Sequence, residues 1–108
     1  MSTFYIKQND TVPSIRATLK NGSGNAVDLA STTIRFHMRA LGGTSAKVDA
    51  AASIINANTG IVQYDWDAAD TDTVGSYQAE FEVTYSDSTV ETFPNNGYIL
   101  IKITDDIT

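Results

Sequence analysis

The stretch that decides the fold is GSYQAEFEVTYSDSTVETF, residues 75–93. From Tyr77 to Tyr85 every second residue is apolar or small, and the residues between them are polar or acidic. A period of two predicts a β-strand that buries one face and leaves the other in water. The SDS turn at residues 86–88 separates this strand from a second short one, TVETF, at residues 89–93.

The same alternation recurs along the chain, in short segments separated by turn residues. The other expected strands cover residues 4–8, 14–20, 33–39, 51–57, 61–66 and 98–104. The NTG turn at 58–60 places Gly60 where a left-handed backbone is wanted. Residues 40–47 are expected to form a flexible loop, and residues 67–75 an irregular stretch with room for one helical turn.

No segment shows a helical period longer than about a turn. About eight short strands predict an all-β fold, an antiparallel immunoglobulin-like β-sandwich, and residues 1–108 are expected to form one domain. Tyr77, at the start of a central strand after an Asp-rich loop, is similar to the tyrosine corner of such sandwiches. The expected core consists of Ile15, Leu19, Ile34, Phe36, Met38, Val62, Tyr64, Trp66, Tyr77, Phe81, Val83, Ile99, Ile101 and Ile103.

The composition excludes several classes of function. The chain has 108 residues and no cysteine, so neither disulfides nor thiolate metal sites can form. Its formal net charge is −6, whereas general binding of nucleic acid or anionic membranes needs a positive surface. Residues 1–12, MSTFYIKQNDTV, contain neither a long apolar run nor a basic leader. We therefore predict no signal peptide, no transmembrane helix, and synthesis in a reducing cytoplasm.

The sequence offers no set of residues for catalysis. His37 is the only histidine, and it lies between Arg35 and Arg39 on the wet face of an expected strand. No carboxylate nearby in sequence would orient it as a general base, so we interpret it as an exposed strand histidine. The LGGTS segment at residues 41–45 lacks the Gly-Lys-Ser/Thr of a phosphate-binding loop. We expect no catalytic residues, no cofactor and no enzymatic activity.

Four aspartates lie close together in DWDAADTDTVG, residues 65–75. Hard oxygen ligands can bind calcium, which makes Asp67, Asp70 and Asp72 candidate ligands. Their spacing does not fit the EF-hand loop. The alternative is that these carboxylates accept hydrogen bonds from loop amides in Asx-turns. We prefer this second interpretation and expect no metal.

The acidic face of the strand at residues 77–85 has a structural explanation. In immunoglobulin-like topology this strand lies beside TIRFHMR, which carries Arg35 and Arg39. These arginines would then face Glu80 and Glu82 across adjacent strands. Opposite-charge pairs of this kind contribute roughly 0.2–1 kcal/mol each and help to set the register.

The last expected strand, YILIKIT at residues 98–104, is apolar on both faces. Its isoleucines face one way, Tyr98 and Leu100 face the other, and only one face can meet the sandwich core. The other face must be covered by the chain's own N-terminus, where Tyr5 is available, or by a partner. We therefore predict Tyr5, Tyr98 and Leu100 as protein-contact residues.

Two longer segments together resemble a known family. They are NDTVPSIRATLKNGSGNAVDLASTTIRFHMR, residues 9–39, and NANTGIVQYDWDAADTDTVGSYQAEFEVTYSDSTVETFPNNGYILIKI, residues 56–103. Their order and spacing are similar to those of the N-terminal domain of phage baseplate upper proteins. The resemblance implies an immunoglobulin-like β-sandwich that serves as a structural part of a virion, without catalytic residues. Long members carry a C-terminal docking arm, which this sequence lacks, so a small stand-alone virion or tail accessory protein is expected.

Two functions stay open at this point. The resemblance favours a non-enzymatic phage structural protein, made in the host cytoplasm and located in the virion, which contacts other virion proteins in the tail, baseplate or head. Because virions repeat their components, we expect a homo-oligomer, with no nucleic-acid and no membrane partner. The alternative is a binding module for a host-surface glycan or protein. An exposed row of aromatic side chains away from the core would favour it.

Overall fold

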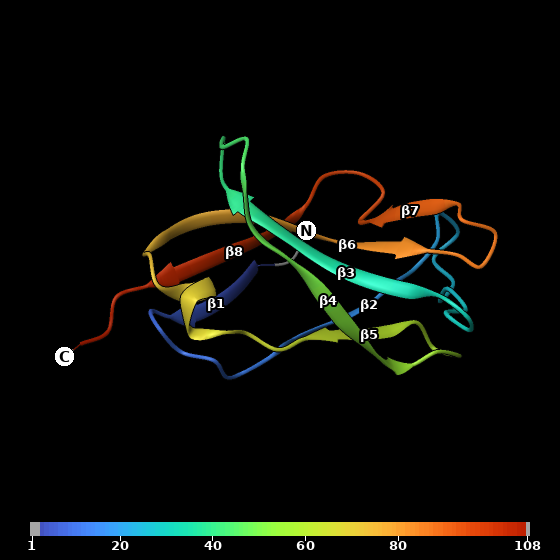
Figure 1. Ribbon diagram of the computed structural model, residues 1–108, viewed down its shortest axis with the longest axis horizontal. Helices are drawn as coiled ribbons and strands as arrows, with labels where there is room; N and C mark the ends of the chain where they lie inside the picture. The colour runs from blue at the N-terminus through green and yellow to red at the C-terminus, as the bar shows by residue number, and fades with distance from the viewer. Residues whose placement is uncertain (1–2, 108) are drawn as a thin grey trace.

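The chain folds almost entirely into β-strands (Figure 1). The computed structural model describes residues 3–107, and within them one helical turn, η1 (Ala68–Thr71), accompanies eight strands. The strands are β1 (Thr3–Lys7), β2 (Ile15–Thr18), β3 (Thr33–Ala40), β4 (Ala46–Asn56), β5 (Ile61–Tyr64), β6 (Gly75–Thr84), β7 (Val90–Phe93) and β8 (Ile99–Thr104). The predicted all-β class, the number of strands and the helical turn are confirmed. In this part of the chain no helix is long and apolar enough to cross a membrane.

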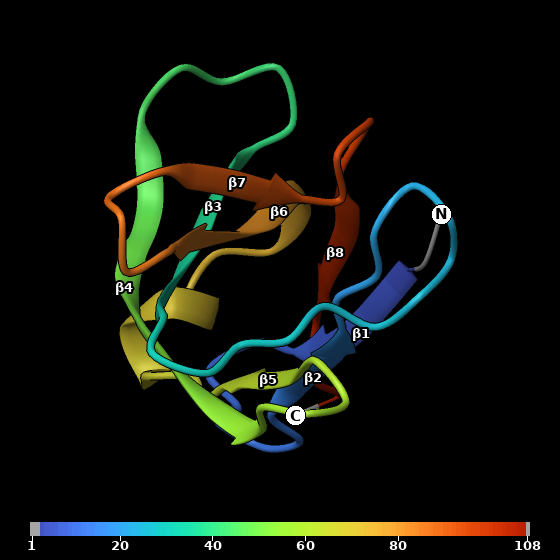
Figure 2. The same ribbon diagram turned by 90° about the vertical axis from the view of Figure 1, so that its right-hand side faces the viewer.

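The strands form two sheets that β4 joins. β4 pairs with β3 as far as Ala52 and with β5 from Ser53 onward. The larger sheet has the order β1-β8-β6-β3-β4, with β7 paired to β6, and the smaller sheet has the order β4-β5-β2. Figure 1 shows β3, β6 and β8 above β5 and β2, with β4 descending from one layer to the other. The result is a nearly closed, barrel-like sheet whose strand order ends at β1 and β2 (Figure 2).

One pair of strands departs from the predicted antiparallel sandwich. β1 runs parallel to β8, with Phe4 opposite Ile101 and Ile6 opposite Ile103, so the sheet is mixed. The remaining ladders between the described strands are antiparallel. Alternation shows which face of a strand is buried but carries no information on its direction. Two parallel strands need a connection of about a dozen residues or more. The chain between β1 and β8 is far longer than that, so its length permits the parallel pairing.

β4 is longer than the sequence predicts. It begins at Ala46 instead of Ala51, so it takes the end of the expected flexible loop. The segment AKVDAAA contains mainly residue types that are depleted in strands. Its buried member, Val48, lies opposite Met38 of β3. Pairing with β3 therefore overrides the local preference of the sequence.

The core lies between the two sheets. Every residue predicted for it is buried except Ile99, which is only partly buried against the others. The ring of Phe36 stacks on Tyr64 with the centroids 4.6 Å apart and lies 5.1 Å from the ring of Phe81. The prediction missed Ile6, Leu29, Val48, Ala79 and Phe93, which are also buried.

Two predicted features of the local structure are confirmed. Gly60 has a φ of 68° in the turn between β4 and β5. The hydroxyl of Tyr77 donates a hydrogen bond to the backbone oxygen of Thr73 at 2.7 Å. This bond from a strand tyrosine to the backbone a few residues upstream is that of a tyrosine corner. It ties β6 to the loop that precedes it.

Candidate functional site

The outer face of the larger sheet carries a cluster of charged side chains from β3, β4 and β6. Arg35 donates from Nε to Asp49 Oδ1 at 2.8 Å. His37 lies between two carboxylates, with Nε2 3.2 Å from Asp49 Oδ1 and Nδ1 3.3 Å from Glu80 Oε2. The side chain of His37 is only 25% exposed, so the interpretation as an exposed strand histidine is wrong. Both ring nitrogens of His37 therefore face carboxylates of the neighbouring strands, which fixes the ring between β4 and β6.

The predicted adjacency of β3 and β6 is confirmed, but the predicted ion pairs between them are not. The two strands are adjacent, and Arg35 lies opposite Glu82. However, Arg35 bonds to Asp49 on its other neighbour, β4. Arg39 lies opposite Gln78, not a glutamate, and donates from Nε to its Oε1 at 2.7 Å. The ion pairs predicted across this boundary are therefore wrong, because β3 has two neighbours and the sequence identified only one.

Arg35 connects β3 to β4 at two points. Besides the bond to the carboxylate, its Nη2 donates to the backbone oxygen of Asp49 at 2.7 Å. The hydrogen bond from Arg35 holds the pKa of the Asp49 carboxyl below its usual range, and His37 lowers it further. Asp49 is therefore ionised over a wider range of acid pH in the folded chain than in the unfolded one.

A hollow of about 380 Å³ lies beside this cluster. Its lining includes His37, Arg39 and Glu80 from the sheet and Tyr98 from the loop before β8. The lining is more polar than apolar, and the hollow is open to solvent. Ordered charges beside an open hollow can orient a partner surface more readily than they can enclose a small molecule.

The residues predicted for protein contact lie on the same outer face. Tyr5 on β1 is 63% exposed, and Leu100 on β8 is partly buried. Thr3 lies opposite Leu100 in the parallel register, so Tyr5 and Leu100 are diagonal neighbours. β1 lies beside β8 and does not cover its outer face. Tyr98 precedes β8 and lines the hollow.

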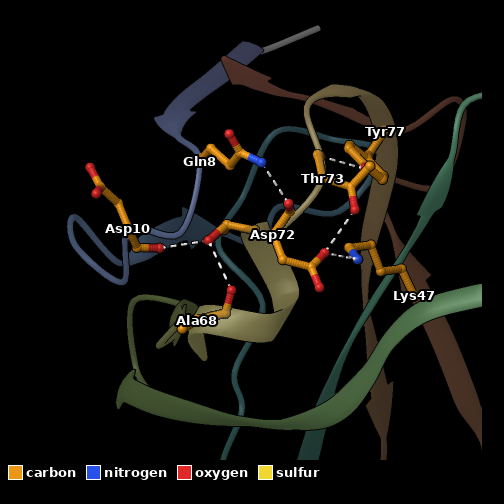
Figure 3. Close-up of polar contacts among 8 residues, drawn as sticks. Gln8, Asp10, Lys47, Ala68, Asp72, Thr73 and Tyr77 are labelled. Carbon is orange, nitrogen blue, oxygen red and sulfur yellow. Dashed lines mark hydrogen bonds and ion pairs between the residues drawn. The ribbon is translucent and has the colours of Figure 1, made fainter. Parts of the chain in front are cut away.

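The acidic loop after β5 is held by hydrogen bonds (Figure 3). Asp72 Oδ1 accepts a bond from Lys47 Nζ at 2.7 Å, which lowers the pKa of Asp72. The backbone oxygen of Asp72 accepts a bond from Gln8 Nε2 at 2.8 Å. The fully buried Thr71 donates from Oγ1 to the backbone oxygen of Asp10 at 2.8 Å. These bonds tie the loop to β4 and to the chain that follows β1.

Of the three candidate metal ligands, Asp70 and Asp72 contact different groups, and Asp67 is bonded to Asp70 through its backbone nitrogen. Asp70 Oδ2 accepts a bond from Tyr64 Oη at 2.5 Å and one from the backbone nitrogen of Asp67 at 2.9 Å. Burial, together with the bond to Asp70, raises the pKa of Tyr64. Asp72 contacts Lys47 instead. Between residues 3 and 107, no three His, Asp or Glu side chains form a group that could hold a metal ion.

The comparison with known protein families identifies the chain. A family model of the BppU N-terminal domain matches residues 3–97. The chain belongs to this family. The BppU N-terminal domain is a domain of phage baseplate upper proteins, so the resemblance seen in the sequence is confirmed. Family membership makes the chain a phage baseplate or tail structural protein, located in the virion, and such phage structural domains are typically non-enzymatic.

The match to the BppU N-terminal domain spans β1 to β7 and ends before Tyr98, so Tyr98 and Leu100 lie outside it. Among solved structures, CopC from Methylosinus trichosporium OB3b is similar, with a TM-score of 0.58. The similarity covers 100% of this chain and 89% of that chain at 16% sequence identity, so it shows a shared fold alone. A search of curated proteins gave no match.

The sequence reasoning missed one member of the charged cluster of this BppU N-terminal domain. The missed residue is Asp49. The expected strand begins at Ala51 and so leaves Asp49 out, whereas β4 begins at Ala46. A signal was present, since Val48 is apolar between the charged residues Lys47 and Asp49. The run of alanines that follows hides this alternation, because small residues fit either face of a strand.

Proposed function

We propose that this BppU N-terminal domain is a non-enzymatic scaffold that binds other virion proteins through the outer face of its larger sheet. The observation that carries the proposal is an outer face with the exposed Tyr5 and the partly buried Leu100 on β1 and β8 and the ordered charges of Arg35, His37 and Asp49 on β3 and β4, in a chain of a baseplate family. Apolar side chains supply area for burial, and fixed charges on the same face set the orientation of the partner.

Several further properties belong to this proposal. Residues 1–108 act as one domain, made in the host cytoplasm and repeated in the particle as a homo-oligomer. The net charge of −6 supports protein partners and disfavours nucleic acid and anionic membranes. His37 lies between two carboxylates, Asp70 contacts Tyr64 and Asp72 contacts Lys47, and catalysis and metal binding form no part of the proposed role.

The alternative, a module for a host-surface glycan or protein, has less support. Sugar-binding faces present aromatic rings on which sugars stack. Among the large apolar side chains of residues 3–107 that are mainly exposed, Tyr5 is the one aromatic. The outer face therefore presents one mainly exposed ring, with Tyr98 partly buried, and not a row of exposed rings.

The test is incorporation of variants into phage particles. Tyr5→Arg alters a largely exposed side chain, so the domain should keep its melting temperature. Mass spectrometry of purified virions should find the parent chain and much less of this variant. Thr33→Arg is the matched control, because Thr33 is exposed and lies on β3 at the far end of the same face.

Leu100→Arg gives a second measurement, with folding checked by thermal melting. If folded Tyr5→Arg and Leu100→Arg chains enter particles as well as the parent does, the contact surface lies elsewhere. If purified virions lack the parent chain, the scaffold role itself is wrong.

A further inference from the structure

The strand order ends at β1 and β2, so the nearly closed sheet is open along one seam between these two strands. β1 pairs with β8 and β2 with β5, and no ladder joins β1 to β2 within residues 3–107. A groove of about 550 Å³ lies at this seam. Its lining is mainly apolar and includes Phe4 from β1, Ile15 from β2 and Ile99 from β8. We call it the seam groove.

The free edge of β2 presents backbone groups to the seam groove. The N–H of Leu19 donates to the backbone oxygen of Gly60 at 2.8 Å, in the register that continues the β2–β5 ladder. Residues that bond to the partner strand alternate with residues that do not. The N–H and C=O groups of Arg16 and Thr18 therefore point away from β5, toward the seam. An open edge of this kind is a template for an added strand.

The charged side chains that line the seam groove are both positive. Arg16 and Lys20 both line it, and neither forms an ion pair with a described residue. Arg16 is held by a neutral side chain, because Gln63 Oε1 accepts from its Nε at 3.0 Å and from its Nη2 at 2.7 Å. Two unneutralised cations on the groove of an acidic protein favour an acidic segment as its occupant.

The segment after β8 has the matching chemistry. Asp105 and Asp106 are exposed and belong to no strand. Ile107 is 96% exposed, the highest value among the large apolar side chains that the structure describes. An isolated isoleucine behind two carboxylates combines an apolar anchor with negative charge.

The segment does not occupy the seam groove of its own copy. Ile107 is 96% exposed, and the chain after β8 leads away from β2 (Figure 1). The segment is therefore free to meet the groove of another molecule.

We propose that the seam groove binds the segment Asp105–Ile107 of a second copy of this chain as a strand added to β2. Ile107 packs on the apolar lining. Because side chains alternate along a strand, Asp106 faces the opposite side, where Arg16 and Lys20 lie. The contact joins two different surfaces, so repeating it produces a ring or an open filament. It uses neither Tyr5 nor Leu100, although Tyr98 lines both the seam groove and the hollow on the outer face.

The experiment mixes two full-length variants, each of which has lost one of the two contact surfaces. Arg16→Glu with Lys20→Glu disables the groove but leaves the segment intact, and Ile107→Ser disables the segment but leaves the groove intact. In analytical ultracentrifugation the parent should associate as its concentration rises, and each variant alone should stay monomeric. Their mixture should form a one-to-one dimer and nothing larger, because it contains one working contact.

Two further measurements sharpen the test. A labelled peptide of residues 104–108 should bind the groove-intact chain, and Ile107→Ser in the peptide should weaken binding about ten- to hundredfold. On association the amides of Arg16 and Thr18 should exchange with deuterium more slowly, while the amide of Thr33, an exposed residue at the end of β3, should not change.

A parent chain that stays monomeric at high concentration overturns the proposal, as does association that neither variant weakens. Slower exchange on β1 alone, with β2 unchanged, also overturns it, because the added strand would then lie on the wrong edge. Failure of this test leaves incorporation into virions through the outer face intact, so the two proposals can be told apart.

Discussion

Gly60 allows three segments of backbone to meet in the turn after β4. Its φ is 68°, and a Cβ on it would lie 2.8 Å from the backbone oxygen of Leu19 and 2.9 Å from that of Val27. Leu19 also accepts a hydrogen bond from the N–H of Val27 at 2.9 Å. A side chain at Gly60 would therefore disturb backbone that is itself bonded.

Gly60→Ala should lower the free energy of unfolding by about 1–3 kcal/mol. Gly24→Ala is the matched control, because Gly24 has a φ of 82° but a Cβ there would have nothing within 4 Å. Urea denaturation should show a larger loss for Gly60→Ala than for Gly24→Ala. Equal losses would show that only the left-handed backbone matters and that the close approach relaxes freely.

Phe81 is the residue whose truncation should cost most on β6. It is fully buried, and its ring meets that of Phe36 in the core. Phe81→Ala should lower the free energy of unfolding by about 3–5 kcal/mol, a large share of the stability of a small domain. Val90→Ala on β7 is the control, since Val90 is 55% exposed and should lose less than about 1 kcal/mol. Similar midpoints for both variants in urea would contradict the assigned core.

At the scale of elements, the bond between β3 and β4 should make stability depend on acid pH. The pKa of Asp49 is lowered in the folded chain, chiefly by the hydrogen bond from Arg35. A lowered pKa stabilises the fold above the unfolded value of about 3.9, and this contribution disappears as pH falls through the lower, folded value. The melting temperature should therefore fall as the pH is reduced below about 4.

Arg35→Gln should flatten that acid slope, because the pKa of Asp49 moves back toward its unfolded value. Arg39→Gln removes the same charge from the same strand but breaks a bond to neutral Gln78. It should leave the slope nearly as in the parent. Melting curves between about pH 2 and 6 provide the measurement. Identical slopes for the two variants would show that the Arg35–Asp49 bond has no effect in solution.

At the scale of the whole molecule, β4 couples the two sheets, because it pairs with β3 in one and with β5 in the other. The single tryptophan, Trp66, is buried in the core that they share. We predict that residues 1–108 unfold as one domain in one cooperative transition. Tryptophan fluorescence and far-ultraviolet circular dichroism should then give the same midpoint in urea. Two separate midpoints would show that the sheets unfold independently.

The sequence by itself determined which residues face the core and where the chain turns. Period-two alternation marks the buried face of each strand, as it does for Phe81 and Val83, and Gly60 marks a turn because few other residues adopt its backbone. The family was also visible, because the order and spacing of many weak motifs resemble those of its members. These signals are local, or depend only on order along the chain.

Only the tertiary structure decided which strands are neighbours and in which direction they run. The parallel pairing of β1 with β8, the early start of β4 at Ala46 and the choice of Asp49 as partner for Arg35 all depend on contacts between distant segments. The seam between β1 and β2 exists because of that strand order. Alternation is the same whichever strand lies alongside, so it determines a face but neither a neighbour nor a direction.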